Sequence, residues 1–77
     1  MTKDENGYPC ACCGLLTLSE GSHDTFEICP ECNWEDDDVQ FNNPNLRGGA
    51  NEESLNEARE NYIKFGASSR KYIKYGQ

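Results

Sequence analysis

Two cysteine pairs of the same build are the residues of this chain whose types and spacing point to chemistry. Each pair is a C-x-x-C turn, and fifteen residues lie between the end of the first turn at Cys13 and the start of the second at Cys29. Two such turns at this spacing are typical of a structural site in which four thiolates surround one zinc ion. The sequence therefore predicts one bound Zn²⁺, and sulfur ligands alone also fit iron.

The chain has five cysteines, so the four ligands have to be selected. When a C-x-x-C turn wraps a metal, the residue after its second cysteine commonly takes a positive φ, which glycine and asparagine tolerate best. Gly14 and Asn33 stand at this position, which selects the ligand set Cys10, Cys13, Cys29 and Cys32. Cys12 is left out, because two adjacent residues cannot easily aim both sulfurs at one small tetrahedral ion. We expect a partly buried bystander thiol there, and the rival interpretation is a reactive thiol or an alternative ligand.

The composition indicates a small domain that needs a bound metal or disulfide bonds to be stable. Only 35% of the 77 residues are apolar, which is too little for a self-sufficient core. The odd cysteine count favours a metal and one free thiol over complete disulfide pairing. The first residues do not resemble a cleavable export signal, and no stretch approaches the ~20 apolar residues of a membrane span. We therefore expect a cytoplasmic protein without a membrane segment.

Charge is strongly acidic and segregated along the chain. The formal net charge is −7, which disfavours nucleic acid as a partner. Residues 20–38 hold eight acids and no Lys or Arg, whereas residues 61–77 hold four basic residues and no acid. Either the basic segment packs near the acidic one or stays solvated, or the acidic segment binds a basic partner. The single histidine, His23, is expected to be a solvated turn residue.

The segment between the cysteine turns is expected to form a β-hairpin. Residues 15–18 and 25–28 are short runs rich in strand-favouring residues, and a loop containing Gly21 joins them. Alternation predicts one buried face, formed by Leu16, Leu18, Phe26 and Ile28. A metal turn, a hairpin and a second metal turn make a zinc ribbon. Tyr8 and Trp34 are expected to cover the metal with aromatic surface.

Beyond the second turn, residues 39–51 are expected to form a loop, and a helix follows. Ser54 and Glu57 fit a capping box at the helix start, with Asn51 as a rival N-cap, and Gly66 supplies the stop. One apolar stripe is expected to pack on the ribbon, formed by Leu55, Ala58, Tyr62 and Phe65. The predicted fold is a small metal-stabilised α+β domain over residues 8–66, a zinc-ribbon hairpin with one or two short helices. Residues 67–77 are expected to form a basic short helix, with Ser68 as its cap, or a tail.

The chain resembles the CPCC family of small, cysteine-rich bacterial proteins. The resemblance covers residues 8 to 66 and rests on five stretches, residues 8–14, 28–32, 34–37 with Gln40, 48–51 and 54–59. One departure is Ala11, which replaces the proline of the motif and removes no ligand. The resemblance implies a bacterial cytoplasmic protein with a zinc-ribbon-like domain and no assigned activity.

The resemblance also draws attention to residues outside the cysteines. Trp34, Asp36, Asp37, Asn51 and Arg59 match the family pattern and form a candidate interaction surface. Their structural alternative is that Arg59 pairs with one of the two aspartates and that Asn51 caps the helix.

Three functions follow from these features. The first is a non-enzymatic zinc-binding module that binds another protein, because four thiolates leave no open position for an activated water. The second is thiol or iron redox chemistry, either rubredoxin-like electron transfer or sensing through Cys12. The third is an acidic protein that binds a basic partner. The sequence does not specify an oligomeric state.

Overall fold

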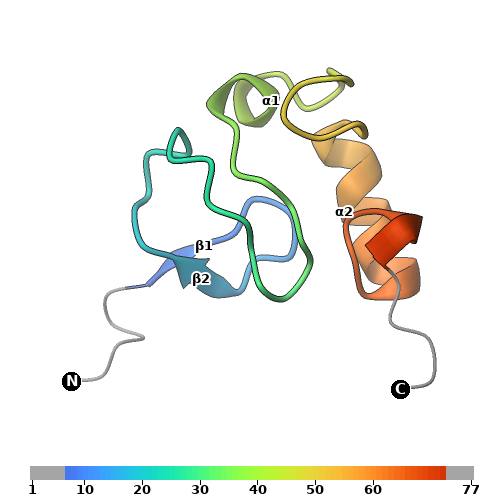
Figure 1. Ribbon diagram of the computed structural model, residues 1–77, viewed down its shortest axis with the longest axis horizontal. Coiled ribbons are helices and arrows are strands. Elements are labelled where there is room, and N and C mark those ends of the chain that lie inside the picture. The colour runs from blue at the N-terminus through green and yellow to red at the C-terminus, as the bar shows by residue number, and fades with distance from the viewer. Residues whose placement is uncertain (1–6, 73–77) are drawn as a thin grey trace.

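A computed structural model describes residues 7–72 of the chain. Five short elements follow one another, namely β1 (Tyr8–Pro9), β2 (Leu16–Leu18), α1 (Asp38–Asn42), α2 (Leu55–Phe65) and the 3₁₀ helix η2 (Arg70–Tyr72). The two strands lie on one side of the molecule, α2 lies on the other side, and α1 lies at one end (Figure 1). The predicted fold class is confirmed: a small α+β protein with a hairpin and a four-cysteine cluster, followed by helices.

The strand pairing differs from the prediction. β1 pairs antiparallel with β2 across the first cysteine turn, with Tyr8 opposite Leu18. Ile28 pairs with Glu35 across the second turn instead of joining residues 15–18. Each cysteine turn therefore brings its own flanking residues together, and the two runs between the turns do not pair with each other.

The predicted buried face of that hairpin is also wrong. Leu18 is buried, but Leu16, Phe26 and Ile28 are each more than half exposed. Phe26 has a positive φ of 59°, which breaks the regular alternation of side chains along its run. The apolar spacing in this segment therefore reports little about the core.

Helix α2 begins and ends where the sequence predicts. The Ser54 hydroxyl accepts a hydrogen bond from the Glu57 amide, and the Glu57 carboxylate accepts one from the Ser54 amide. This second hydrogen bond lowers the pKa of the Glu57 carboxyl. Gly66 ends the helix with a φ of 80°. The rival N-cap, Asn51, is wrong.

Helix α1 lies where the sequence predicts a loop. Asp37 caps it, because its Oδ1 accepts hydrogen bonds from the amides of Val39 (2.8 Å) and Gln40 (3.4 Å). The helix has five residues and only one of them, Gln40, is buried. A helix this short carries no apolar periodicity, so its cap is the signal that reveals it.

The buried core is small and centred on cysteine. Cys10, Cys12, Cys29 and Cys32 form one buried cluster with Trp34, Leu55 and Ala58, and Tyr62 packs against it. The apolar stripe of α2 is thus confirmed for its first residues, whereas Phe65 stays 39% exposed. Within residues 7–72, no helix has the length and apolar character needed to cross a membrane.

The segment after α2 returns to the core. Ala67, Ser68 and Ser69 are buried, and the Ser68 amide donates to the Cys32 carbonyl at 2.8 Å. Part of the predicted C-terminal helix is present as η2, and residues 73–77 lie outside the described part of the chain. The C-terminal segment therefore fastens the second cysteine turn from outside.

Candidate metal centre

The two cysteine turns are built from the same hydrogen bonds. In the first turn the Cys10 amide donates to the Leu15 carbonyl (2.9 Å), and the Gly14 amide donates to the Cys10 carbonyl (2.9 Å). In the second turn, nineteen residues later along the chain, the Cys29 amide donates to the Trp34 carbonyl (3.0 Å) and the Asn33 amide donates to the Cys29 carbonyl (2.8 Å). Gly14 has a φ of 81° and Asn33 has a φ of 68°, so the predicted positive φ is confirmed in both turns.

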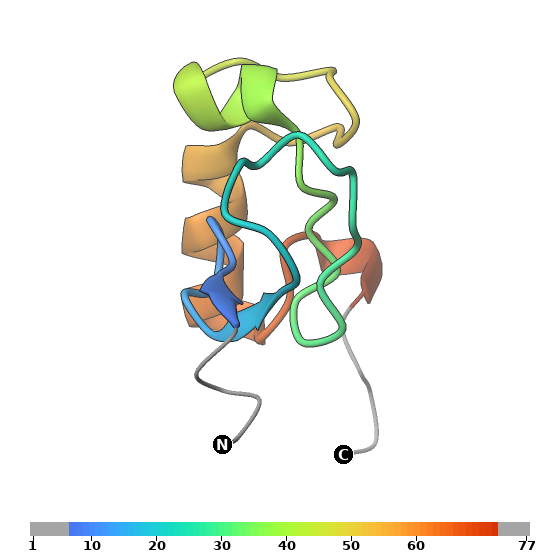
Figure 2. The same ribbon diagram turned by 90° about the vertical axis from the view of Figure 1, so that its left-hand side faces the viewer.

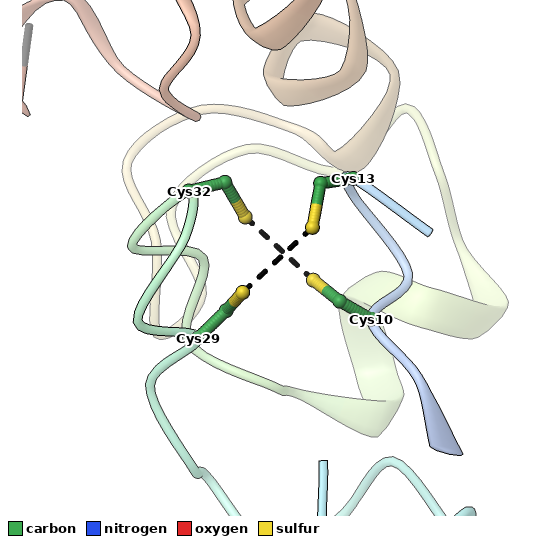
Figure 3. A group of neighbouring side chains, drawn as sticks. All are labelled: Cys10, Cys13, Cys29 and Cys32. Carbon is green, nitrogen blue, oxygen red and sulfur yellow. Dashed lines mark hydrogen bonds between the residues drawn. The ribbon is translucent and has the colours of Figure 1, made fainter. Parts of the chain in front are cut away.

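The two turns aim four sulfurs at one point. Figure 3 shows the side chains of Cys10, Cys13, Cys29 and Cys32 converging from two separate loops. All four sulfurs lie within 4.8 Å of one another. The Cys10–Cys32 sulfurs are 3.6 Å apart and the Cys13–Cys29 sulfurs are 3.8 Å apart.

These separations fit a tetrahedral ion. With metal–sulfur bonds of about 2.3 Å, the corners of a tetrahedron lie about 3.8 Å apart. A disulfide would bring two sulfurs to about 2.05 Å, and all five cysteines are free thiols. The four-sulfur cluster could therefore hold one metal ion.

Hydrogen-bond donors surround the sulfurs. The amide of Cys12 donates to Cys10 Sγ and the amide of Glu31 donates to Cys29 Sγ, each at 3.4 Å. Thr17 Oγ1 donates to Cys29 Sγ at 3.1 Å. Such donors stabilise negative charge on metal-bound sulfur and orient it.

Without a cation, the sulfurs share protons unequally. Hydrogen bonding with the Cys10 thiol lowers the pKa of Cys29 far below its usual range. The same interaction raises the pKa of Cys10. A bound divalent cation would replace these protons and let all four sulfurs ionise, so metal affinity in this cluster depends on pH.

Cys12 is buried in the same core but lies outside the group of four sulfurs. It is 8% exposed, and its sulfur does not belong to the group of metal-ligating side chains found among residues 7–72. The structure thus brings together the four cysteines that Gly14 and Asn33 select. Cys12 packs among the core side chains.

Aromatic cover comes from one of the two predicted residues. Trp34 is 1% exposed and lies in the same buried cluster as Cys10, Cys29 and Cys32. Tyr8 is 45% exposed, and its ring packs over Gly21, so its predicted place over the sulfurs is wrong.

The two aspartates of the candidate interaction surface are buried. Asp36 is completely buried, and its Oδ1 lies 2.9 Å from Nδ1 of His23. The His23 ring stacks on Phe41 with 3.9 Å between centroids, so the prediction of a solvated histidine is wrong. Asp37 caps α1 with one oxygen and accepts from the Ala50 amide with the other. With Trp34 also buried, these three residues do not present an exposed surface.

Arg59 and Asn51 also differ from their expected contacts. Arg59 Nε donates to the carbonyl of Ala11 at 2.9 Å. Arg59 therefore ties α2 to the first cysteine turn and does not pair with Asp36 or Asp37. Asn51 accepts from the Glu35 amide (2.9 Å) and donates to the Glu35 carbonyl (2.8 Å). The Asn51 side chain therefore substitutes for a neighbouring strand beside Glu35.

Gln40 is the structural centre that sequence reasoning missed. Its amide nitrogen donates to the carbonyls of Leu46, Asn51 and Glu53, and its Oε1 accepts from the backbone and side-chain nitrogens of Asn51. Gly49 lies so close that an added Cβ would stand 2.8 Å from Gln40 and from Asp37 Oδ2. Gly49 is therefore the one sequence signal of this close backbone approach.

Comparison of the sequence with known proteins identifies one protein family. No curated protein matches this chain. The family model described as "Cysteine-rich CPCC" matches residues 8–77, which is nearly the entire sequence and includes both cysteine turns and α2. The chain therefore belongs to the cysteine-rich CPCC family.

Proposed function

We propose that this protein is a zinc-binding interaction module, without catalytic activity, that holds one structural Zn²⁺ on Cys10, Cys13, Cys29 and Cys32. The observation that carries the proposal is the convergence of four sulfurs at the separations of a tetrahedral ion. Amide and hydroxyl donors to two of these sulfurs support it further.

The metal supplies the stability that this core lacks. Four of the seven residues in the buried cluster are cysteines, and only Trp34, Leu55 and Ala58 add other apolar side chains. The apparent binding energy of a structural zinc is on the order of 10–16 kcal/mol. That is comparable to the entire net stability of a typical folded domain, about 5–15 kcal/mol.

A binding role is favoured over an enzymatic one. Four thiolates complete the coordination of zinc and leave no position for a water nucleophile. The single histidine is paired through Nδ1 with the buried Asp36 and stacked on Phe41, so it holds the loop at residues 19–25 against α1. A protein partner and a reducing, cytoplasmic setting belong to the same proposal, since cysteines without disulfide bonds persist best there.

Mass spectrometry under native and denaturing conditions, with a thiol count in each state, tests the proposal. We expect one zinc per chain, one slowly reacting thiol (Cys12) before unfolding and five reactive thiols afterwards. If the purified protein is red and absorbs visible light, the bound metal is iron and not zinc, which would favour electron transfer. Loss of the Cys12 thiol on mild peroxide treatment, with the metal retained, would favour redox sensing over a purely structural role.

A further inference from the structure

A small cleft lies on the side of the molecule where the second cysteine turn meets the C-terminal segment. One wall is the hairpin around that turn, with Ile28 and Glu35, and the other walls come from residues 50–53 and from η2. Figure 2 shows η2 beside this turn. The cleft holds about 100 Å³. Binding sites for drug-sized molecules measure about 300–1,000 Å³, so this one fits a single amino-acid side chain.

The charge of the walls selects a cation. Glu35, Glu52 and Glu53 line the cleft with one basic residue, Lys71, so carboxylates outnumber ammonium groups by three to one. Glu53 is held in place, because Ser69 Oγ donates to its Oε2 at 2.7 Å. Glu35 is fixed through its backbone by Asn51. The Glu53 carboxylate and the Glu35 backbone are therefore held by contacts within the chain itself.

Apolar surface accompanies these charges. Ile28 is 59% exposed and Tyr72 is 38% exposed, and both line the cleft. Lysine and arginine bury an aliphatic stem along such surface while the charged head reaches polar groups. An isolated metal ion or a small anion would gain nothing from contact with the apolar side chain of Ile28.

The chain's own lysine shows that the rim accommodates an ammonium group. Lys71 Nζ lies 3.7 Å from Glu52 Oε1 and 5.4 Å from the centroid of the Tyr72 ring. Both members of this ion pair are more than half exposed, and exposed pairs contribute little to stability. A guest cation can therefore displace Lys71 at small cost.

From these observations we propose that the cleft binds a lysine or arginine side chain presented by a partner polypeptide. The stem would lie along Ile28 and Tyr72, and the head would face Glu35 and Glu53. The inference rests on the proposed function, since it names the surface and the partner chemistry of the interaction module. Of the predicted interaction surface, Asn51 lines the cleft, whereas Trp34, Asp36 and Asp37 are buried and do not line it.

Titration of the zinc-loaded, ¹⁵N-labelled protein by NMR tests the cleft. The probes are three blocked tripeptides whose central residue is arginine, lysine or the neutral isostere citrulline. We expect the two cationic peptides to shift the amides of Asn33, Asn51, Glu52 and Tyr72, with weak affinity that falls as salt is added. The citrulline peptide should leave these amides unmoved.

Isosteric variants distinguish binding in the cleft from non-specific attraction of a cation to an acidic protein. Glu35→Gln and Glu53→Gln should each weaken binding of the arginine peptide roughly three- to fivefold. Glu60→Gln on α2 removes the same charge from an exposed position that does not line the cleft, and it should leave the affinity unchanged. Equal weakening by all three variants, or shifts caused by citrulline, would overturn the proposal.

The same samples keep the two proposals distinguishable. Protein that carries one zinc and is folded, but shows no shifts at the cleft, would refute the cleft and leave the zinc module intact. Protein that folds without metal and still binds the arginine peptide would refute the structural zinc and leave the cleft standing.

Discussion

Two buried centres hold this small chain together, and they differ in what each one needs. The sulfur centre consists of Cys10, Cys13, Cys29 and Cys32, and the amide centre consists of Asp37, Gln40 and Asn51 with their hydrogen bonds. Both fasten segments that are far apart in the sequence. In the amide centre, donors and acceptors belonging to the chain satisfy one another, whereas four crowded sulfurs hold excess negative charge once ionised. The amide centre is therefore complete by itself, and the sulfur centre calls for a cation.

Helix α2 connects the two centres. It starts next to Glu53, whose carbonyl accepts from Gln40, and two of its residues, Leu55 and Ala58, pack against the cysteines. Arg59 adds a hydrogen bond to the first cysteine turn. Damage to the sulfur centre should therefore undo the core that α2 packs against, while damage to the amide centre should loosen mainly α1 and the loop before α2.

The largest expected effect comes from breaking the sulfur centre. Cys13→Ser replaces one thiolate by a hydroxyl, so the proposed zinc should be lost and the chain should unfold, because metal binding of order 10 kcal/mol exceeds what the remaining core supplies. Far-UV circular dichroism and metal content measure the two losses. Cys29→Ser should behave in the same way.

Cys12→Ser is the matched control for that experiment. Cys12 is buried beside Cys13 but lies outside the four-sulfur cluster, so the variant should keep one zinc and the fold. A Cys12→Ser protein that loses its metal would show that the ligand set is wrong. A Cys13→Ser protein that stays folded without metal would show that the sulfur centre is dispensable.

A smaller, separable effect is expected at the amide centre. Gln40→Leu keeps the size of the side chain but removes its hydrogen bonds to Leu46, Asn51 and Glu53. Each buried polar group left without a partner costs about 1–3 kcal/mol, and we expect a total loss of about 3–4 kcal/mol. Urea unfolding of the zinc-loaded protein measures this loss, and the zinc content should stay at one.

Asn42→Leu provides the comparison on the same helix. Asn42 is exposed, and within residues 7–72 its side-chain amide donates to the Asp38 carbonyl alone, so the substitution should change stability by less than about 1 kcal/mol. If Gln40→Leu is equally mild, the amide centre carries little of the stability. If it releases zinc, the two centres are one cooperative unit.

Sequence reasoning found the features that depend on one or two positions. The ligand set followed from cysteine spacing and from Gly14 and Asn33, which only had to satisfy a local backbone rule. The capping box at Ser54 and the stop at Gly66 are local in the same sense. Each of these is a short pattern with a direct steric or hydrogen-bonding cause, and the structure realises all of them.

The features that the sequence does not predict arise from contacts between distant residues, or they leave no periodic pattern in the sequence. Alternation along residues 25–28 predicted a buried face, but pairing across the cysteine turn leaves Phe26 and Ile28 exposed. Gln40 and Asn51 form a network of amides that has no periodicity to detect. Arg59 was expected beside an aspartate, and the contact it makes, with Ala11, spans 48 residues.

The smallest effect concerns the likeness of the two cysteine turns. At Gly14 an added Cβ would meet no atom within 4 Å, so the cost of Gly14→Ala is that of the left-handed backbone alone, about 1–2 kcal/mol. Gly14→Asn should cost less than half as much, because asparagine already holds this conformation at Asn33 in the second turn. The reciprocal pair, Asn33→Gly and Asn33→Ala, should be nearly neutral and about 1 kcal/mol destabilising, respectively. All four are compared by urea unfolding at one fixed zinc concentration. Equal losses for Gly14→Asn and Gly14→Ala would mean that the first turn needs glycine for a reason other than its φ, and that the two turns are alike only in their hydrogen bonds.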